Sequence, residues 1–253
     1  MPAPKDHDLA LTFGREAAAY DRGRPGYPDE AVLWILARAA SGSGRPHVVD
    51  VGAGTGKFTA SLANRPTEVT AVEPDPAMRD RLAASFPGVA AVEGSAERLP
   101  LADSSADLVT MAQAWHWVDV EPASREIARV LRPEGALALV WNVRDAEVPW
   151  VSELTRVMGS SIAEDFDTEK PPVAAPLERT EYAEFRWTNE LDRAAFRDMV
   201  ASRSYVIAMA PEEREHLFTE LDTFLRTHPD LAGHDLIPLP YVTRVTIARP
   251  TAV

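Results

Sequence analysis

Short apolar runs and helical periodicities alternate along the first 145 residues of the chain. The apolar runs predict strands at residues 47–51, 68–73, 89–93, 106–111 and 136–141. Between the runs, apolar side chains recur at helical spacing, as they do at Met78, Leu82 and Phe86. Strands that alternate with helices are typical of a parallel sheet covered by helices on both faces. The pattern therefore predicts a doubly wound α/β fold.

The alternation stops after about residue 145. Further helices are predicted near residues 150–158, 194–205 and 211–226, and further strands at 184–191 and 239–248. A proline-rich loop separates the first of these helices from the strand that follows. We expect the inserted helices to cap a pocket.

Composition narrows the classes of function. The chain has 253 residues and no cysteine, so disulfides, thiolate metal sites and thiol nucleophiles are excluded. Its six histidines are scattered, so no metal site is predicted. The net charge is -13, which disfavours nucleic acid as the main partner. No signal sequence or membrane-spanning run is visible, so we expect a cytoplasmic protein with no membrane partner.

A glycine-rich turn follows the first predicted strand. Gly52, Gly54 and Gly56 have the spacing G-x-G-x-G, which lets a ligand lie close to the backbone. A phosphate-binding loop would need Ser or Thr at position 58, which is Phe58. A dinucleotide fingerprint would need glycine at position 57, which is Lys57. The turn therefore disfavours both of those cofactor classes.

An acid stands where a cofactor's ribose could be bound. Glu73 ends the second predicted strand, 21 positions after Gly52. An acid at about this distance, at the end of the neighbouring strand, is placed to accept hydrogen bonds from ribose hydroxyls. A solvated strand-end glutamate is the alternative explanation.

Four segments together resemble the class I S-adenosylmethionine (SAM)-dependent methyltransferases. They are Asp-Val-Gly-Ala-Gly-Thr-Gly at 50–56, Ala-Val-Glu-Pro-Asp at 71–75, Gly-Ser-Ala-Glu-Arg-Leu-Pro at 94–100 and Leu-Arg-Pro-Glu-Gly at 131–135. Within that family the chain is similar to the small-molecule group that includes trans-aconitate and ubiquinone/menaquinone-biosynthesis methyltransferases. The resemblance covers about residues 10–249. It implies a Rossmann-like seven-stranded sheet, mostly parallel, whose last strand is antiparallel.

The resemblance also implies a division of the chain. It gives one methyltransferase domain, with an N-terminal lid at 1–27 and a SAM-binding core at 28–145. The cap helices and sixth strand would occupy 146–237, and the last strand 238–253.

The resemblance implies roles for residues near the cofactor, SAM, whose product is S-adenosylhomocysteine (SAH). The glycines would approach its methionine and ribose parts, Asp50 would position the turn or reach the amino group, and Glu73 would bind the ribose. Ser95 stands where many relatives have aspartate, which puts the contact to the adenine amino group in question. The expected cofactor-binding residues are Tyr20, Arg24, Asp50, Gly52, Ala53, Gly54, Gly56, Glu73, Pro74, Ser95, Ala96 and Gln113.

The acceptor side is predicted from the end of the fourth strand. Trp115, His116 and Trp117 follow that strand, so they could wall a small pocket, and His116 could act as a general base. Tryptophans packed under the next helix and a structural histidine are the alternatives. The full set of expected substrate-binding residues is Tyr27, Trp115, Trp117, Arg203, Tyr205 and Tyr241.

These observations favour methyl transfer from SAM to a small-molecule acceptor, such as a carboxylate, by in-line displacement. Two alternatives stay open. One is a SAM-binding regulator or partner protein without turnover, and the other is an NAD-dependent oxidoreductase, which the glycine spacing disfavours. RNA or protein as the methyl acceptor is a weaker third option. The acceptor and the oligomeric state are not predicted.

Overall fold

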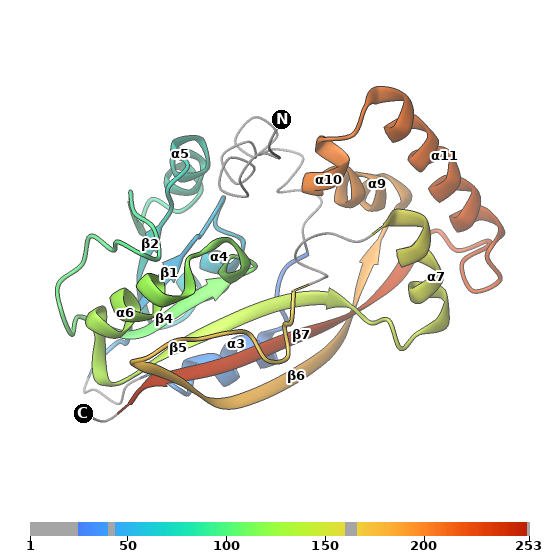
Figure 1. Cartoon of the computed structure of the whole chain (residues 1–253). Helices are drawn as coiled ribbons and strands as arrows, with labels where there is room; N and C mark the ends of the chain where they lie inside the picture. The colour runs from blue at the N-terminus through green and yellow to red at the C-terminus, as the bar shows by residue number, and fades with distance from the viewer. Residues whose placement is uncertain (1–24, 40–43, 160–165, 252–253) are drawn as a thin grey trace.

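A computed structural model describes residues 25–39, 44–159 and 166–251 (Figure 1). Most of the expected N-terminal lid, including Tyr20 and Arg24, lies outside these ranges. In the described ranges no helix is both long enough and apolar enough to cross a bilayer.

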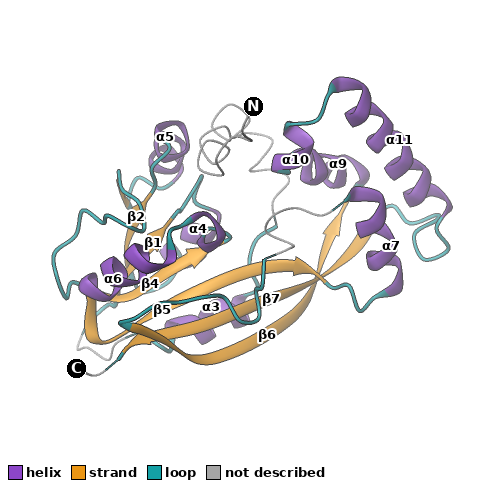
Figure 2. Ribbon diagram, in the orientation of Figure 1, coloured by secondary structure: helices purple, strands orange, loops and turns teal. Residues whose placement is uncertain are grey.

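Seven strands form one sheet in the order β3-β2-β1-β4-β5-β7-β6 (Figure 2). The strands β1 to β5 pair in parallel with their neighbours, whereas β7 is antiparallel to both β5 and β6. This arrangement confirms the predicted seven-stranded, mostly parallel sheet with an antiparallel last strand. The strand bounds are β1 His47–Val51, β2 Glu68–Val72, β3 Ala90–Val92, β4 Ala106–Ala112, β5 Leu131–Arg144, β6 Leu177–Leu191 and β7 Ile237–Pro250.

Helices cover both faces of the sheet. On one face, α3 (Asp29–Leu36) and α4 (Lys57–Ala63) bury their apolar side chains against alternate residues of the central strands. On the other face, α6 (Val120–Val130) packs against the intervening strand residues, and Trp141 lies fully buried beneath it. The central strands are apolar on both sides because both sides are covered.

A second apolar cluster holds the cap helices together. The cap consists of α7 (Pro149–Met158), α9 (Arg193–Ala201), α10 (Ser204–Ile207) and α11 (Pro211–Thr227), and these helices share buried side chains with the adjoining ends of β6 and β7. Figure 1 shows the group gathered beyond one end of β5. We call this end, where β1, β4 and β5 finish, the carboxyl edge. Ligands of open α/β sheets bind at this edge.

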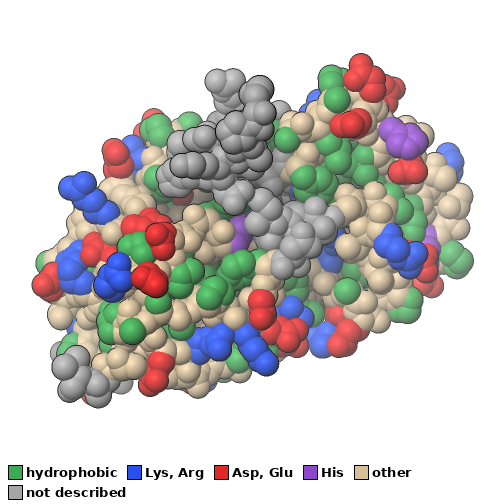
Figure 3. All heavy atoms as spheres, in the orientation of Figure 1, with side chains coloured by type: hydrophobic (Ala, Val, Ile, Leu, Met, Phe, Trp, Pro, Cys, Tyr) green, Lys and Arg blue, Asp and Glu red, His purple; other side chains and the backbone are tan. Residues whose placement is uncertain are grey.

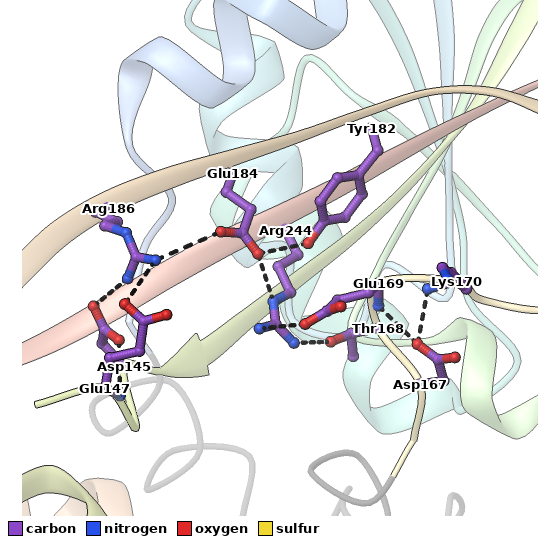
Figure 4. Close-up of polar contacts among 10 residues, drawn as sticks. All are labelled: Asp145, Glu147, Asp167, Thr168, Glu169, Lys170, Tyr182, Glu184, Arg186 and Arg244. Atoms are coloured by element: carbon purple, nitrogen blue, oxygen red, sulfur yellow. Dashed lines mark hydrogen bonds and ion pairs between the residues drawn. The ribbon is translucent and has the colours of Figure 1, made fainter.

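Three predicted element bounds were wrong. β6 begins at Leu177 rather than Glu184. The prediction missed its first half because polar residues lie along it, and Figure 4 shows part of this polar face. There, Arg244 on β7 joins Glu184 at 3.1 Å and Glu169 at 3.0 Å. The predicted helix at 194–205 is divided between α9 and α10. β5, predicted at 136–141, begins at Leu131 opposite Ala106 and ends at Arg144.

Candidate active site

The three glycines of the turn after β1 all have positive φ angles, +67° at Gly52, +58° at Gly54 and +94° at Gly56. Their surroundings differ. A Cβ atom on Gly52 would lie 2.7 Å from Ala114, and one on Gly56 would lie 2.7 Å from the ring of Phe86. The nearest atom to a Cβ on Gly54 would be a methionine sulfur at 3.9 Å. Gly52 and Gly56 are therefore needed for packing, whereas none of the described residues crowds Gly54.

Glu73 follows β2 and lies beside Gly54. Its carboxylate accepts hydrogen bonds from the backbone N–H of Gly54 at 2.7 Å and of Asp75 at 2.9 Å. Asp75 in turn caps helix α5 (Pro76–Ser85) by accepting from the first-turn N–H groups. Burial raises the pKa of Glu73, which is only 6% exposed. Each carboxylate oxygen can accept more than one hydrogen bond, so Glu73 could also accept from ribose hydroxyls.

Asp50 lies beneath the turn. Its carboxylate accepts hydrogen bonds from the hydroxyl of Thr59 at 2.6 Å and from that of Thr110 at 3.0 Å, on the neighbouring strand β4. Burial raises the pKa of Asp50 to about 6. Of the two roles that the sequence suggested, this geometry fits positioning the turn, because Asp50 ties it to α4 and β4.

The predicted adenine-side residues lie in a tight turn after β3. The backbone groups of Ser95 and Arg98 hydrogen-bond each other in both directions, at 3.1 and 3.2 Å. Ala96 lies at the tip of this turn and is buried in the core on the α6 side of the sheet.

Gln113 follows β4 with a φ of +57°, an uncommon value for a residue that is not glycine. Its backbone N–H donates to the carbonyl of Val140 at 2.8 Å. Its side-chain Nε2 donates to the main-chain carbonyl of Asn142 at 2.9 Å. Both bonds reach β5, so they hold Gln113 at the carboxyl edge.

The three aromatic residues after Gln113 form a short 3-10 helix, η2 (Trp115–Trp117), rather than an extension of the strand. Trp115 is fully buried, and its indole N–H donates to the carbonyl of Pro172 at 2.7 Å. The structure thus places Trp115 in the core, where it packs rather than lines an open surface. The ring of His116 lies 4.8 Å from that of Trp117 and 6.0 Å from that of Phe166.

Comparisons with known proteins identify the family. The sequence profile of a methyltransferase domain matches residues 49–139. An uncharacterized methyltransferase of Mycobacterium tuberculosis is 44% identical over 244 residues, which are 95% of this chain and 98% of that protein. The chain belongs to the class I SAM-dependent methyltransferases.

Two further similarities concern structure and chemistry. A solved structure described as a candidate type II methyltransferase from Anaeromyxobacter dehalogenans has a TM-score of 0.70 at 26% identity, and covers 90% of this chain and 97% of its own. The malonyl-[acyl-carrier protein] O-methyltransferase of Dechloromonas aromatica is 38% identical over 128 residues, 48% of each chain.

The remaining predicted residues of this methyltransferase come from three separate places. Tyr27, which precedes α3, packs edge-on against Phe58 of α4, with ring centroids 4.8 Å apart. Tyr241 on β7 is 2% exposed and its ring stacks on that of Trp187. Arg203 lies between the cap helices α9 and α10 and is 9% exposed, and Tyr205 lies within α10.

Two residues of the carboxyl edge were missed by sequence reasoning. Asn142 accepts a hydrogen bond from Gln113 through its main-chain carbonyl. Arg144 is 7% exposed, and its guanidinium lies 3.3 Å from the sulfur of Met158. Both stand at the end of an apolar strand, a position that could have singled them out. Among the described residues, no group of three or more acidic or histidine side chains could hold a metal ion.

Proposed function

We propose that this methyltransferase transfers the methyl group of SAM to a small-molecule acceptor that has a carboxylate. When bound, SAM supplies an electrophilic methyl group on a sulfonium sulfur. The task of the protein is then to align the acceptor with the methyl group and to exclude water.

One observation underlies the cofactor assignment. Among the described residues, a Cβ on Gly54 would meet only a methionine sulfur at 3.9 Å, whereas Cβ atoms on Gly52 and Gly56 would clash with the packed interior, and the buried carboxylate of Glu73 lies beside Gly54. An open backbone position next to a buried acceptor of hydrogen bonds suits a ligand that presents hydroxyl groups. In this arrangement Glu73 binds the ribose hydroxyls, and Asp50 keeps the turn in place from below.

Two observations support an anionic acceptor. The chain has a net charge of -13, yet it buries the guanidinium groups of Arg144 at the carboxyl edge and Arg203 in the cap. Guanidinium groups match carboxylates in geometry and charge. The relative from Dechloromonas aromatica is named for O-methylation of a malonyl group, which supports oxygen as the methylated atom.

A carboxylate acceptor requires no general base. A carboxylate oxygen is nucleophilic when ionised, so the acceptor loses no proton during the transfer. His116 would be needed as a base only for a phenol, an amine or a carbon acid. Substitution of His116 by Asn is therefore expected to change the turnover of a carboxylate only slightly.

The cofactor assignment is tested by isothermal titration with SAM, SAH and NAD. We expect SAM and SAH to bind and NAD to give no response. A response to NAD alone would favour an oxidoreductase. Binding of SAM without turnover, in a screen that begins with small carboxylic acids, would favour a regulatory protein.

Gly54→Val supplies a sharper version of this test. Its side chain would occupy the proposed cofactor position next to Glu73 and would be strained at a φ of +58°, so SAH binding should be lost. Gly88→Ala is the matched control, because a Cβ there meets nothing within 4 Å. A folded Gly54→Val protein with unchanged SAH affinity would refute the cofactor assignment.

A further inference from the structure

A chain of hydrogen bonds runs across the carboxyl edge and connects four strands. The indole N–H of Trp187 on β6 donates to the hydroxyl of Thr243 on β7 at 2.9 Å. That hydroxyl donates to Oδ1 of Asn142 on β5 at 2.6 Å. The main-chain carbonyl of Asn142 accepts from Gln113, the residue that follows β4. Asn142 is therefore the point at which the chain of bonds meets the candidate cofactor site.

The direction of these bonds is fixed by chemistry. An indole N–H can only donate, so the Thr243 hydroxyl accepts from Trp187. A main-chain carbonyl can only accept, so the Asn142 atom that faces the carbonyl of Gly26 is Nδ2, and the Thr243 hydroxyl donates to Oδ1. The amide oxygen of Asn142 therefore faces Thr243, and its Nδ2 faces the opposite way. There, Nδ2 donates to the carbonyl of Gly26 at 2.8 Å. Thr243 is fully buried, so water does not compete for its own hydrogen bonds, whereas the bond from Nδ2 to Gly26 is exposed.

The contact with Gly26 holds the segment that precedes α3. We call residues 25–28 the entry segment. Asn142 binds this segment from β5 through Gly26, and Phe58 contacts its Tyr27 from α4, the helix that follows the glycine turn. The entry segment is thus attached both to β5 and to the helix that begins at the candidate cofactor site.

The contact with Gln113 fixes the side-chain amide of that residue. Its Nε2 donates to the carbonyl of Asn142, so its Oε1 is the atom left to accept a hydrogen bond from a ligand. Gln113 also precedes Ala114, whose methyl group packs against Gly52 of the turn. A shift of Asn142 would therefore be passed to a residue beside the glycine turn.

We infer that Asn142 is a positioning residue for the cofactor site. Its main-chain carbonyl orients Gln113 so that Oε1 can accept a hydrogen bond from the cofactor, and its side-chain amide holds the entry segment at the carboxyl edge. The buried hydroxyl of Thr243 sets its orientation. This inference rests on the proposed function, since it assumes that the ligand beside Gln113 is SAM or SAH.

The affinity for SAH in variants of Thr243 tests the inference. Thr243→Val removes the bond that orients the Asn142 side chain, and with it the hold of Nδ2 on the entry segment, whereas the main-chain carbonyl that Gln113 binds is unchanged. We expect SAH to bind about fivefold more weakly, as for the loss of one hydrogen bond. Thr243→Ser keeps the hydroxyl and should restore the affinity. Thr246→Val is the matched control, because Thr246 is equally buried on β7 and its hydroxyl has no hydrogen-bond partner within the described ranges.

Unfolding midpoints of the three variants separate positioning from stability. A purely structural role would lower the midpoint of Thr243→Val without changing SAH affinity in the folded protein. Equal SAH affinity of Thr243→Val and the wild type would overturn the inference. Absence of SAH binding to the wild-type protein would instead refute the proposed function, and with it the cofactor role of Asn142.

The entry segment is tested without any ligand. Asn142→Asp keeps an oxygen for Thr243 but places a second oxygen against the carbonyl of Gly26, so this contact is lost. We expect amide hydrogen exchange in a peptide covering residues 26–32 to accelerate at least about twofold. A peptide covering α11 should be unchanged. Unchanged exchange at residues 26–32 would overturn this part of the inference.

Discussion

At the scale of single residues, Gly52, Gly54 and Gly56 share left-handed backbone angles but differ in function. Two of them are glycine because packed side chains leave no room for a Cβ atom, whereas none of the described residues would crowd a Cβ on Gly54. The spacing in the sequence predicts the turn. It cannot distinguish these roles, because Ala114 and Phe86 reach the turn only through the folding of other elements.

The same scale yields a prediction of pH dependence for Asp50. Burial raises its pKa to about 6 in the folded protein, from an ordinary value of 3.8. The proton that Asp50 binds on folding stabilises the protein fully below about pH 4, and this contribution is lost as the pH rises through 6. It amounts to about 3 kcal/mol, because one pKa unit corresponds to about 1.4 kcal/mol.

Asp50→Asn removes this titration. The stability of the variant relative to the wild type should rise between pH 4 and pH 7 by an amount approaching that value. Urea denaturation at a series of pH values measures the difference, and it cancels the contribution of the other carboxylates. A difference that does not change with pH would show that Asp50 is not perturbed in the folded protein.

At the scale of elements, local pattern predicted the strands and helices that obey one simple periodicity. It failed for strand segments that have charged side chains on one face, because such segments do not read as apolar runs. The first half of β6 has Glu178 and Glu181, which the pattern left outside the strand predicted to begin at Glu184, but it pairs with β7 throughout. The arginine partner Arg38 makes Glu181 compatible with a strand. Such pairings join residues far apart in the sequence, so no local window reveals them.

A second prediction concerns the caps of two helices. Asp75 caps α5 and Asp192 caps α9, each by accepting from first-turn N–H groups. Replacing either with alanine should lower the free energy of unfolding by about 1 kcal/mol. Only Asp75→Ala should also weaken SAH binding, because loss of this cap loosens the first turn of α5, which contributes Met78 beside Gly54 and adjoins the main-chain N–H of residue 75 that holds Glu73. Chemical denaturation and titration of both variants with SAH would separate the effects, and equal affinities would contradict the link.

At the scale of the whole molecule, the two sides of the site differ in how far the sequence could predict them. The cofactor side is assembled from neighbouring segments, so Glu73 was predicted by its distance along the chain from the turn. The opposite side brings together Asn142, Thr243 and Trp187 from three strands. Their proximity depends on the antiparallel insertion of β7 between β5 and β6, which fixes the register of all three. The spacing of these residues along the chain does not reveal that register.

The net charge of the molecule leads to a last prediction, which compares two ligands of nearly identical shape. SAM has a sulfonium charge that SAH lacks, so at neutral pH SAM has a net charge of about +1 and SAH a net charge of about 0. A protein of charge -13 attracts SAM, and added salt shortens the distance over which this attraction acts. Figure 3 shows acidic and basic side chains intermixed on one face, so the attraction should be moderate.

Raising the ionic strength from about 0.01 M to about 1 M reduces the Debye length from about 30 Å to about 3 Å. The ratio of the dissociation constants of SAM and SAH should then rise about two- to threefold. The comparison removes effects of salt on the fold, because both ligands occupy the same site. A constant ratio would mean that the local charge at the site is balanced, with buried arginines such as Arg144 and Arg203 offsetting Asp50 and Glu73. The salt dependence therefore measures how far the acidic surface, rather than the site itself, determines the electrostatic attraction of the cofactor.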